Sequence, residues 1–265
     1  MTRHVSAAND YGLAAYRDVG DHAALERAGL FVAEGRLIVQ RLLEDGRFRV
    51  HSVVVTPPAA AALASTFENR PDITVLVCNP ELLHEITGFD FHRGCLALAR
   101  RKERGDELAL ATTILALEGV GNPDNIGGLF RSAFALGVDG ILLDPATGDP
   151  LYRKAIRTSM GSTLRVPYAR ATTWPGELDA LRARGFQVIA LTPHPDAVSL
   201  DAVDVTATMR IILLVGSEGA GLGSDAMRAS DMKVRIPLNP RADSLNVVVA
   251  ASIALHALRG GRAHG

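Results

Sequence analysis

The sequence predicts an α/β protein in two parts, a small N-terminal α/β domain and a larger C-terminal domain built on a parallel sheet. Short strand-like runs alternate with helical segments up to residue 100, and a charged run without apolar residues, RKERGDE at 101–107, is typical of a linker. Beyond it, near-continuous apolar runs of strand length alternate with helical segments. This pattern favours a parallel sheet covered by helices on both faces. We therefore expect one domain over 1–104 and a second over 105–265.

The N-terminal domain is expected to begin helix-rich and to continue with strands. Within residues 21–46, Leu37, Ile38 and Leu42 recur at helical spacing. Short runs of β-branched and aliphatic residues predict strands at 51–56, 73–78 and 95–100. Helical connectors are expected in the alanine-rich stretch after Pro58 and in the segment from Pro80.

The C-terminal domain is expected to repeat a strand-then-helix unit. Apolar runs predict strands at 112–117, 140–144, 186–192 and 210–216. Helical periodicity predicts helices at 125–137, 174–185 and roughly 244–259. The last six residues, GGRAHG at 260–265, are expected to form a disordered tail.

Composition narrows the class of protein. A hydrophobic content of 48% allows a sizeable core, and a net charge of −1 means that any nucleic-acid contact must come from local clusters of basic residues. Cys78 and Cys95 are too few for a disulfide framework and have apolar neighbours, which favours buried thiols. The eight histidines show no metal-ligand spacing. No run reaches the length of a membrane span and the N-terminus lacks a secretory apolar region, so we expect a reduced cytoplasmic setting.

A glycine-rich loop, GSEGAGLGS at 216–224, follows the last predicted strand. A dinucleotide fingerprint begun at Gly219 needs a glycine where the chain has Ser224, and a P-loop begun at Gly216 needs a lysine where it has Leu222. Both nucleotide motifs therefore fail, which disfavours a nucleotide-dependent oxidoreductase. The alternative of a plain strand-to-helix turn, with Glu218 near a helix N-terminus, stays open.

Three separated segments resemble, in order, the three motifs of the SpoU/TrmH methyltransferases, members of the trefoil-knotted SPOUT superfamily. They are NPDNIGGLFRSAFALGVDGILL at 122–143, LLVGSEGAGLG at 213–223 and IPLNPRADSLNVVVAASIALHAL at 236–258. The stretch FVAEGRLIVQRLL at 31–43 resembles a substrate-binding domain related to ribosomal protein L30e that many members carry. The resemblance implies an L30e-like domain followed by a parallel-sheet domain with a trefoil knot.

The resemblance also implies a reaction, methyl transfer from S-adenosylmethionine to a ribose 2′-hydroxyl of RNA without a metal, leaving S-adenosylhomocysteine. It assigns catalytic roles to Arg131, Asn125, Glu218, Ser244 and Asn246. Cofactor contacts are implied at Leu191, Thr192, Gly216, Ile236, Leu238, Ser244 and Leu245. One departure is visible, because Val248 stands where the family often has a second serine.

Physical alternatives accompany these roles. Ser244 and Asn246 could simply cap the last helix, and Asp124 or Asn125 is a candidate N-cap of the first motif's helix. Arg131 could be a solvated helix arginine, but its apolar flanks suggest that it needs a phosphate or carboxylate partner. A guanidinium is not a credible base. Our hypothesis is that Arg131 clamps a phosphate and stabilises alkoxide character, while the proton leaves to phosphate, to water or to a perturbed group.

Basic clusters favour RNA as the partner. Residues 149–168, DPLYRKAIRTSMGSTLRVPY, begin a stretch that is basic and acid-poor, and they resemble the ribosomal-RNA-directed branch of the family. The residues expected to contact RNA are Arg93, Arg153, Lys154, Arg157 and Arg165. Family members act as homodimers whose knots pack together, so a homodimer is implied. The favoured substrate is 23S ribosomal RNA; transfer RNA, a resistance methyltransferase and a non-catalytic RNA-binding protein that retains the fold remain alternatives.

Overall fold

The computed structural model describes residues 1–17, 19–88, 94–102, 108–206 and 208–259. By its internal contacts the chain divides into two compact units, Met1–Glu103 with Leu151–Arg165, and Arg104–Pro150 with Val166–Gly265. The expected domain boundary at 104/105 falls outside the described residues, as do most of the predicted linker and the predicted tail at 260–265. The boundary therefore stays a prediction. The segment Leu151–Arg165 packs with the first unit although it follows that boundary in the chain.

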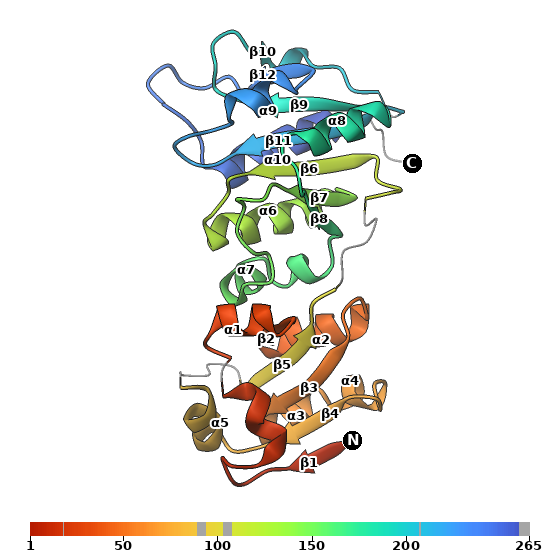
Figure 1. Cartoon of the computed structure of the whole chain (residues 1–265), viewed down its shortest axis with the longest axis vertical. Helices are drawn as coiled ribbons and strands as arrows, with labels where there is room; N and C mark the ends of the chain where they lie inside the picture. The colour runs from red at the N-terminus through yellow and green to blue at the C-terminus, as the bar shows by residue number, and fades with distance from the viewer. Residues whose placement is uncertain (18, 89–93, 103–107, 207, 260–265) are drawn as a thin grey trace. The chain divides into compact units, whose positions relative to one another are not determined.

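The described residues of the first unit form one mixed sheet (Figure 1). Its strands are β1 (Thr2–His4), β2 (Leu30–Glu34), β3 (Val50–Val55), β4 (Thr74–Val77) and β5 (Cys95–Arg100), in the order β1-β4-β3-β5-β2. β1, β4 and β3 run parallel, whereas β5 is antiparallel to both of its neighbours. The three strands predicted for this region are confirmed.

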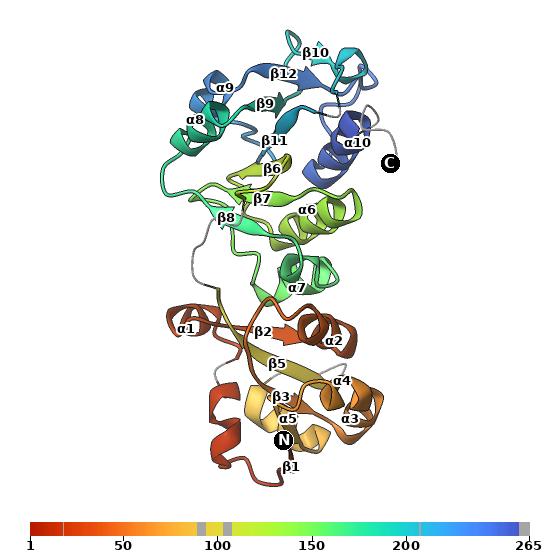
Figure 2. The same cartoon turned by 90° about the vertical axis from the view of Figure 1, so that its right-hand side faces the viewer.

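Helices cover both faces of this sheet. They are η1 (Tyr11–Tyr16), α1 (His22–Arg27), α2 (Arg36–Asp45), α3 (Pro57–Ala62), α4 (Ala64–Glu68) and α5 (Pro80–Thr87), joined by α7 (Arg153–Thr158) and η2 (Ser162–Leu164). Figure 2 shows η1 and α1 on the opposite face of the sheet from α2 and α4. The connectors predicted after Pro58 and from Pro80 are helical, as expected.

Residues 21–46, expected to be helix-rich, contain α1 and α2 but also a strand between them that was not predicted. Leu30–Glu34 forms β2, paired antiparallel with β5, and Gly35 with a φ of 97° separates it from α2. A short apolar run such as Leu30–Ala33 fits a buried strand as well as a helix, and here the pairing with β5 decides.

The first unit has a hydrophobic core formed by its own side chains. Tyr16 is fully buried, and its hydroxyl lies 2.8 Å from Ser52 Oγ. Cys78 and Cys95 are free and buried, as predicted. Burial raises the pKa of the Cys78 thiol to about 11 and that of Cys95 to about 12, so both stay protonated near neutral pH.

The second unit is built on a parallel sheet, which confirms the predicted fold class. Its strands are β6 (Thr113–Glu118), β7 (Gly140–Leu143), β8 (Tyr168–Arg170), β9 (Phe186–Leu191), β10 (Val198–Ser199), β11 (Arg210–Gly216) and β12 (Met232–Arg235), in the order β10-β12-β9-β11-β6-β7-β8. Every neighbouring pair is parallel. The four predicted strands are confirmed; β8, β10 and β12 were missed because they are short and interrupted by polar residues.

Helices lie on both faces of this sheet too (Figure 2). They are α6 (Pro123–Ala135), α8 (Gly176–Ala183), α9 (Ser224–Arg228) and α10 (Val247–Arg259), with η3 (Leu200–Ala202). α8 and α9 lie on one face and α6 and α10 on the other. Helix α6 begins two residues earlier than predicted, because its N-cap is Asn122 and not Asp124 or Asn125; the Asn122 side chain accepts from the Asp124 amide at 2.9 Å. None of the helices that the structure describes has the length and apolar character needed to span a membrane.

Helices α6 and α10 pack closely. A Cβ added to Gly128 would lie 2.8 Å from a methyl of Val248, and Ser252 Oγ donates to Ser132 Oγ at 2.8 Å. Val248, the departure from the family pattern, therefore fills the space left by Gly128. This packing fixes the first and third motif segments against each other.

Candidate functional site

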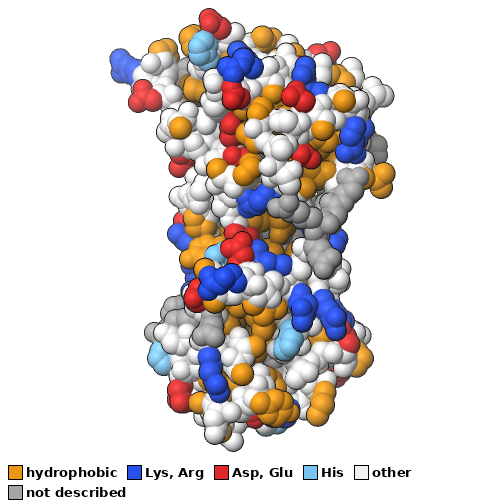
Figure 3. Space-filling view, viewed as in Figure 1, with side chains coloured by type: hydrophobic (Ala, Val, Ile, Leu, Met, Phe, Trp, Pro, Cys, Tyr) orange, Lys and Arg blue, Asp and Glu red, His pale blue; other side chains and the backbone are white. Residues whose placement is uncertain are grey.

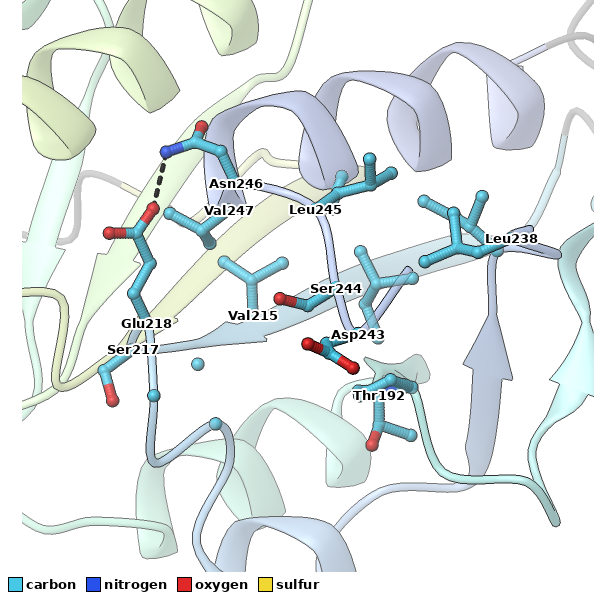
Figure 4. Close-up of a pocket in the computed structure, with 17 residues that line it drawn as sticks. Thr192, Val215, Ser217, Glu218, Leu238, Asp243, Ser244, Leu245, Asn246 and Val247 are labelled. Carbon is cyan, nitrogen blue, oxygen red and sulfur yellow. Dashed lines mark hydrogen bonds between the residues drawn. The ribbon is translucent and has the colours of Figure 1, made fainter. Parts of the chain in front are cut away.

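Three parallel strands of the second unit end at one edge of the sheet, where ligands of open α/β sheets usually bind. The segments that follow β9, β11 and β12, together with the start of α10, enclose a cavity of about 620 Å³ (Figure 4). Its lining residues are Leu191, Thr192, Pro193, Val215, Gly216, Ser217, Glu218, Gly219, Gly221, Ile236, Leu238, Asp243, Ser244, Leu245, Asn246, Val247 and Ala250. The cavity lies within the second unit.

The glycine-rich loop after β11 is folded tightly on itself. The Gly221 amide donates to the Ser217 carbonyl at 3.0 Å. A Cβ at Gly216 would lie 2.3 Å from the Gly221 backbone, so any side chain at this position would overlap with the loop and force it to move. Glycine at 216 thus permits the turn that brings exposed backbone to the cavity wall.

A carboxylate at the end of the neighbouring strand braces this loop. Glu118, the last residue of β6, accepts from Trp174 Nε1 at 2.9 Å and from the Gly223 amide at 3.0 Å. The two bonds use different oxygens of the carboxylate. Glu118 thereby fixes the end of the loop relative to the sheet. No sequence pattern marked this residue.

Residues from all three motif segments meet at Asn246. Its Nδ2 donates to Glu218 Oε1 at 2.5 Å, drawn in Figure 4, and to Asn125 Oδ1 at 3.1 Å. Its Oδ1 accepts from the Val248 amide at 3.0 Å. The capping role considered for Asn246 therefore exists, and the same amide also joins Glu218 and the buried Asn125.

All residues predicted to contact the cofactor line the cavity. These are Leu191, Thr192, Gly216, Ile236, Leu238, Ser244 and Leu245. Their roles stay predictions, because their position alone does not identify a ligand. Asp243 also lines the cavity, but the sequence analysis did not identify it. The one sequence feature that could have identified it is its position directly before Ser244.

Arg131 lies apart from these groups. It is on α6, it does not line the cavity, and its side chain is exposed to solvent. The partner expected from its apolar flanks is not supplied by the chain: within the described ranges no hydrogen bond or ion pair reaches its guanidinium. Its charge is therefore free to meet an external anion.

The predicted RNA contacts are spread over α7 and its flanks. Arg153 lies 3.9 Å from Glu34 and Arg165 lies 3.8 Å from Asp45 in the first unit, while Arg157 is exposed and Lys154 half-buried. Arg93 falls outside the described residues. On the face drawn in Figure 3, basic and acidic side chains lie interspersed. The assignment to RNA stays a prediction.

Arg170, another member of the basic stretch, has a structural role. Its guanidinium donates to the carbonyls of Asp144, Thr147 and Gly148 at 2.9, 2.5 and 2.9 Å. These contacts hold the loop after β7, so this arginine is not available to phosphate.

Comparisons with known proteins show which proteins the chain resembles. The chain matches the SpoU rRNA Methylase family over residues 112–256. An uncharacterized tRNA/rRNA methyltransferase of Mycobacterium tuberculosis is 41% identical over 231 residues, which cover 86% of this chain and 80% of that protein. The 23S rRNA (guanosine(2553)-2′-O)-methyltransferase of Bacillus subtilis is 33% identical over 155 residues, 58% of this chain and 61% of that protein. An AdoMet-bound rRNA methyltransferase of Sinorhizobium meliloti shares the fold with a TM-score of 0.83 and 28% identity, over 98% of both chains.

Proposed function

The chain belongs to the SpoU rRNA methylase family, and from this premise we propose that it transfers the methyl group of S-adenosylmethionine to a ribose 2′-hydroxyl of RNA. The observation that carries the proposal is the meeting of Asn125, Glu218 and Asn246 beside the cavity. Each comes from a different motif segment. Intact polar groups at all three places favour catalysis over a non-catalytic RNA-binding protein that retains the fold.

The cavity suits S-adenosylmethionine. Its volume of about 620 Å³ falls within the ~300–1,000 Å³ usual for pockets of small ligands. Leu191, Ile236 and Leu245 offer apolar surface to an adenine ring, and the glycine loop offers backbone hydrogen-bonding groups. When bound, S-adenosylmethionine supplies an activated methyl group on a positively charged sulfur. The solved relative from Sinorhizobium meliloti, whose fold this chain shares, holds the same compound.

Arg131 is the residue proposed to act on the RNA. Its exposed guanidinium can hold a backbone phosphate through two parallel hydrogen bonds and so place the adjacent ribose. The same charge stabilises negative charge that develops on the attacking oxygen. Because a guanidinium keeps its protons, the hydroxyl proton leaves to phosphate, to water or to another group of the site.

Asn246 and Glu218 are proposed to shape the acceptor side of the cavity. The bond from Asn246 Nδ2 holds Glu218 Oε1 in place, while the second carboxylate oxygen has no hydrogen bond to the described residues. That oxygen can accept a bond from a ribose hydroxyl or from water. Asn125, whose Oδ1 accepts from Asn246 Nδ2, fixes the orientation of the Asn246 amide. These groups position the acceptor, which is the principal contribution of an enzyme to a methyl transfer of this kind.

A homodimer through α6 and α10 forms part of the proposal. Phe134 on α6 and Val249 and Ile253 on α10 are 43%, 47% and 41% exposed, although α6 and α10 pack together. Neighbouring helices that expose large apolar side chains are typical of a protein–protein interface. Arg131 lies on α6 as well, so the interface would bring it close to the partner subunit.

The proposed substrate is 23S ribosomal RNA. The Bacillus subtilis relative is named for a 2′-O modification of that RNA, and the Sinorhizobium meliloti relative is an rRNA methyltransferase. Arg157 and Arg165 are exposed and can neutralise backbone phosphate. Transfer RNA is the second candidate, because the Mycobacterium tuberculosis relative is named for both RNAs. Both cysteines are free and buried, which suits the reducing cytoplasm where either RNA is found.

The proposal is tested by incubating the protein with methyl-tritiated S-adenosylmethionine and, separately, ribosomal or transfer RNA. We expect label in ribosomal RNA, and a loss of about 100-fold in Arg131→Lys because a lysine cannot form the bidentate clamp. Arg228→Lys, an exposed arginine on α9, is the matched control and should keep wild-type turnover.

Other results of this experiment would change the proposed substrate or function. Label in transfer RNA alone would mean that transfer RNA, and not 23S ribosomal RNA, is the substrate. Near-normal turnover in Arg131→Lys would refute the proposal that Arg131 clamps a phosphate through two hydrogen bonds. Tight cofactor binding without transfer to either RNA would argue for a different acceptor, and no cofactor binding would favour the RNA-binding alternative.

A further inference from the structure

The charged side chains that line the cavity all carry negative charge. Among the described residues that line it, two are charged, Glu218 and Asp243, and both are acidic; no Lys, Arg or His is present. A cavity wall that carries carboxylates and no basic side chain favours a negative potential inside it. The potential favours a ligand that carries net positive charge.

The two carboxylates differ in how they are held. Glu218 is bonded to Asn246 Nδ2 at 2.5 Å, so part of its charge is already stabilised. Asp243 forms no hydrogen bond or ion pair with other residues in the described ranges. In Figure 4 its carboxylate lies near Thr192, away from the Glu218–Asn246 pair.

Local structure presents Asp243 to the cavity. The preceding residues form a turn, in which the Ala242 amide donates to the Asn239 carbonyl at 2.8 Å and the Arg241 amide donates to Asn239 Oδ1 at 3.0 Å. The turn places Asp243 on the wall next to Ser244 and Leu245. The segment before α10 thus puts an unpaired, solvent-exposed carboxylate on the cavity wall.

We propose that Asp243 makes the cavity selective for the cationic methyl donor over its neutral product. This inference rests on the proposed function, because it takes S-adenosylmethionine as the ligand. The donor and the product, S-adenosylhomocysteine, differ by one methyl group and by the positive charge on sulfur. A wall with an unpaired carboxylate distinguishes them by that charge. Asp243 is a specificity residue, and it assists exchange of spent product for fresh donor.

Binding calorimetry tests the inference without any turnover. Wild type, Asp243→Asn and Asp243→Glu are titrated with S-adenosylmethionine, with S-adenosylhomocysteine and with sinefungin, in which a charged amine replaces the sulfonium. We expect Asp243→Asn to weaken binding of the two cationic ligands about five- to tenfold, with little change for the neutral product. Asp243→Glu should restore most of the preference for the donor. Asp201→Asn, which removes an exposed acid outside the cavity, should bind all three ligands like wild type.

Equal weakening of donor and product in Asp243→Asn, or no change in either, would overturn the inference and leave the proposed function intact. Equal binding of donor and product by wild type would overturn it as well. Failure of wild type to bind S-adenosylmethionine at all would instead refute the proposed function.

Discussion

At the scale of single residues, Asn246 serves both the fold and the site. Its oxygen caps the start of α10, and its nitrogen joins Glu218 to Asn125. A cap contributes about 1 kcal/mol, whereas the amide hydrogens act on side chains of the candidate site. The two functions belong to different atoms and can therefore be separated by substitution.

The variant Asn246→Asp should separate them. Aspartate keeps the capping oxygen, so the free energy of unfolding should stay within about 1 kcal/mol of wild type. It loses both donated hydrogen bonds and places a second carboxylate beside Glu218, so turnover should fall by about 100-fold. Urea unfolding and a methyl-transfer assay measure the two effects. Asn239→Asp, in the turn before the cavity residues, is the control; an active Asn246→Asp enzyme would show that the nitrogen contacts are dispensable.

At the scale of helices and strands, periodicity located most elements but failed where tertiary pairing decides. The runs that became β6, β9 and β11 are almost continuously apolar and long enough to be recognised. β2 is apolar too, but it lies next to a helical pattern, and its pairing with β5 was invisible in the sequence. β10 has two residues, and it is a strand because β12 lies beside it.

The residues of the candidate site also divide into those that local sequence patterns predicted and those that depend on tertiary contacts. The three motif segments pointed to the residues around Asn246 and to the cofactor side of the cavity. The brace from Glu118 could not be predicted, because it joins Gly223, 105 residues further along the chain, and Trp174, 56 residues further along. Such contacts depend on how the strands are ordered in the sheet, which no local pattern specifies.

The glycine loop gives an element-scale prediction. In Gly216→Ala the new methyl would meet the Gly221 backbone at 2.3 Å, and relieving that overlap costs about 1–3 kcal/mol. The loop must open, so affinity for S-adenosylmethionine should fall at least about tenfold in calorimetry. Gly121→Ala is the matched control, since its Cβ would meet nothing within 4 Å. Wild-type affinity in Gly216→Ala would mean that the loop does not bind the cofactor.

At the scale of the whole molecule, the order of the three motif segments predicted the fold class, and the parallel sheet confirms it. The resemblance supplied what composition could not, because a net charge of −1 gives no sign of an RNA partner. The trefoil knot and the homodimer remain predictions of that resemblance. The position of Arg131 is one reason for proposing a homodimer, since its exposed guanidinium does not line the cavity of its own chain.

The homodimer is tested by a charge on the exposed apolar face. Ile253→Glu should give a monomer in light scattering, because a buried glutamate without a partner is costly at an interface. Val198→Glu is the matched control: Val198 is 46% exposed and lies on β10, not on α6 or α10, and the variant should stay dimeric. A wild-type protein that is monomeric at all concentrations would refute the assembly.

The proposed reaction leaves the methyl group on a ribose oxygen of RNA. The most direct measurement is mass spectrometry of nucleosides from RNA methylated by the purified protein, compared with the same reaction run with Arg131→Ala. We expect a single 2′-O-methylated nucleoside that is lost in the variant. A methyl group found on a base, or a 2′-O-methyl product that persists in Arg131→Ala, would contradict it.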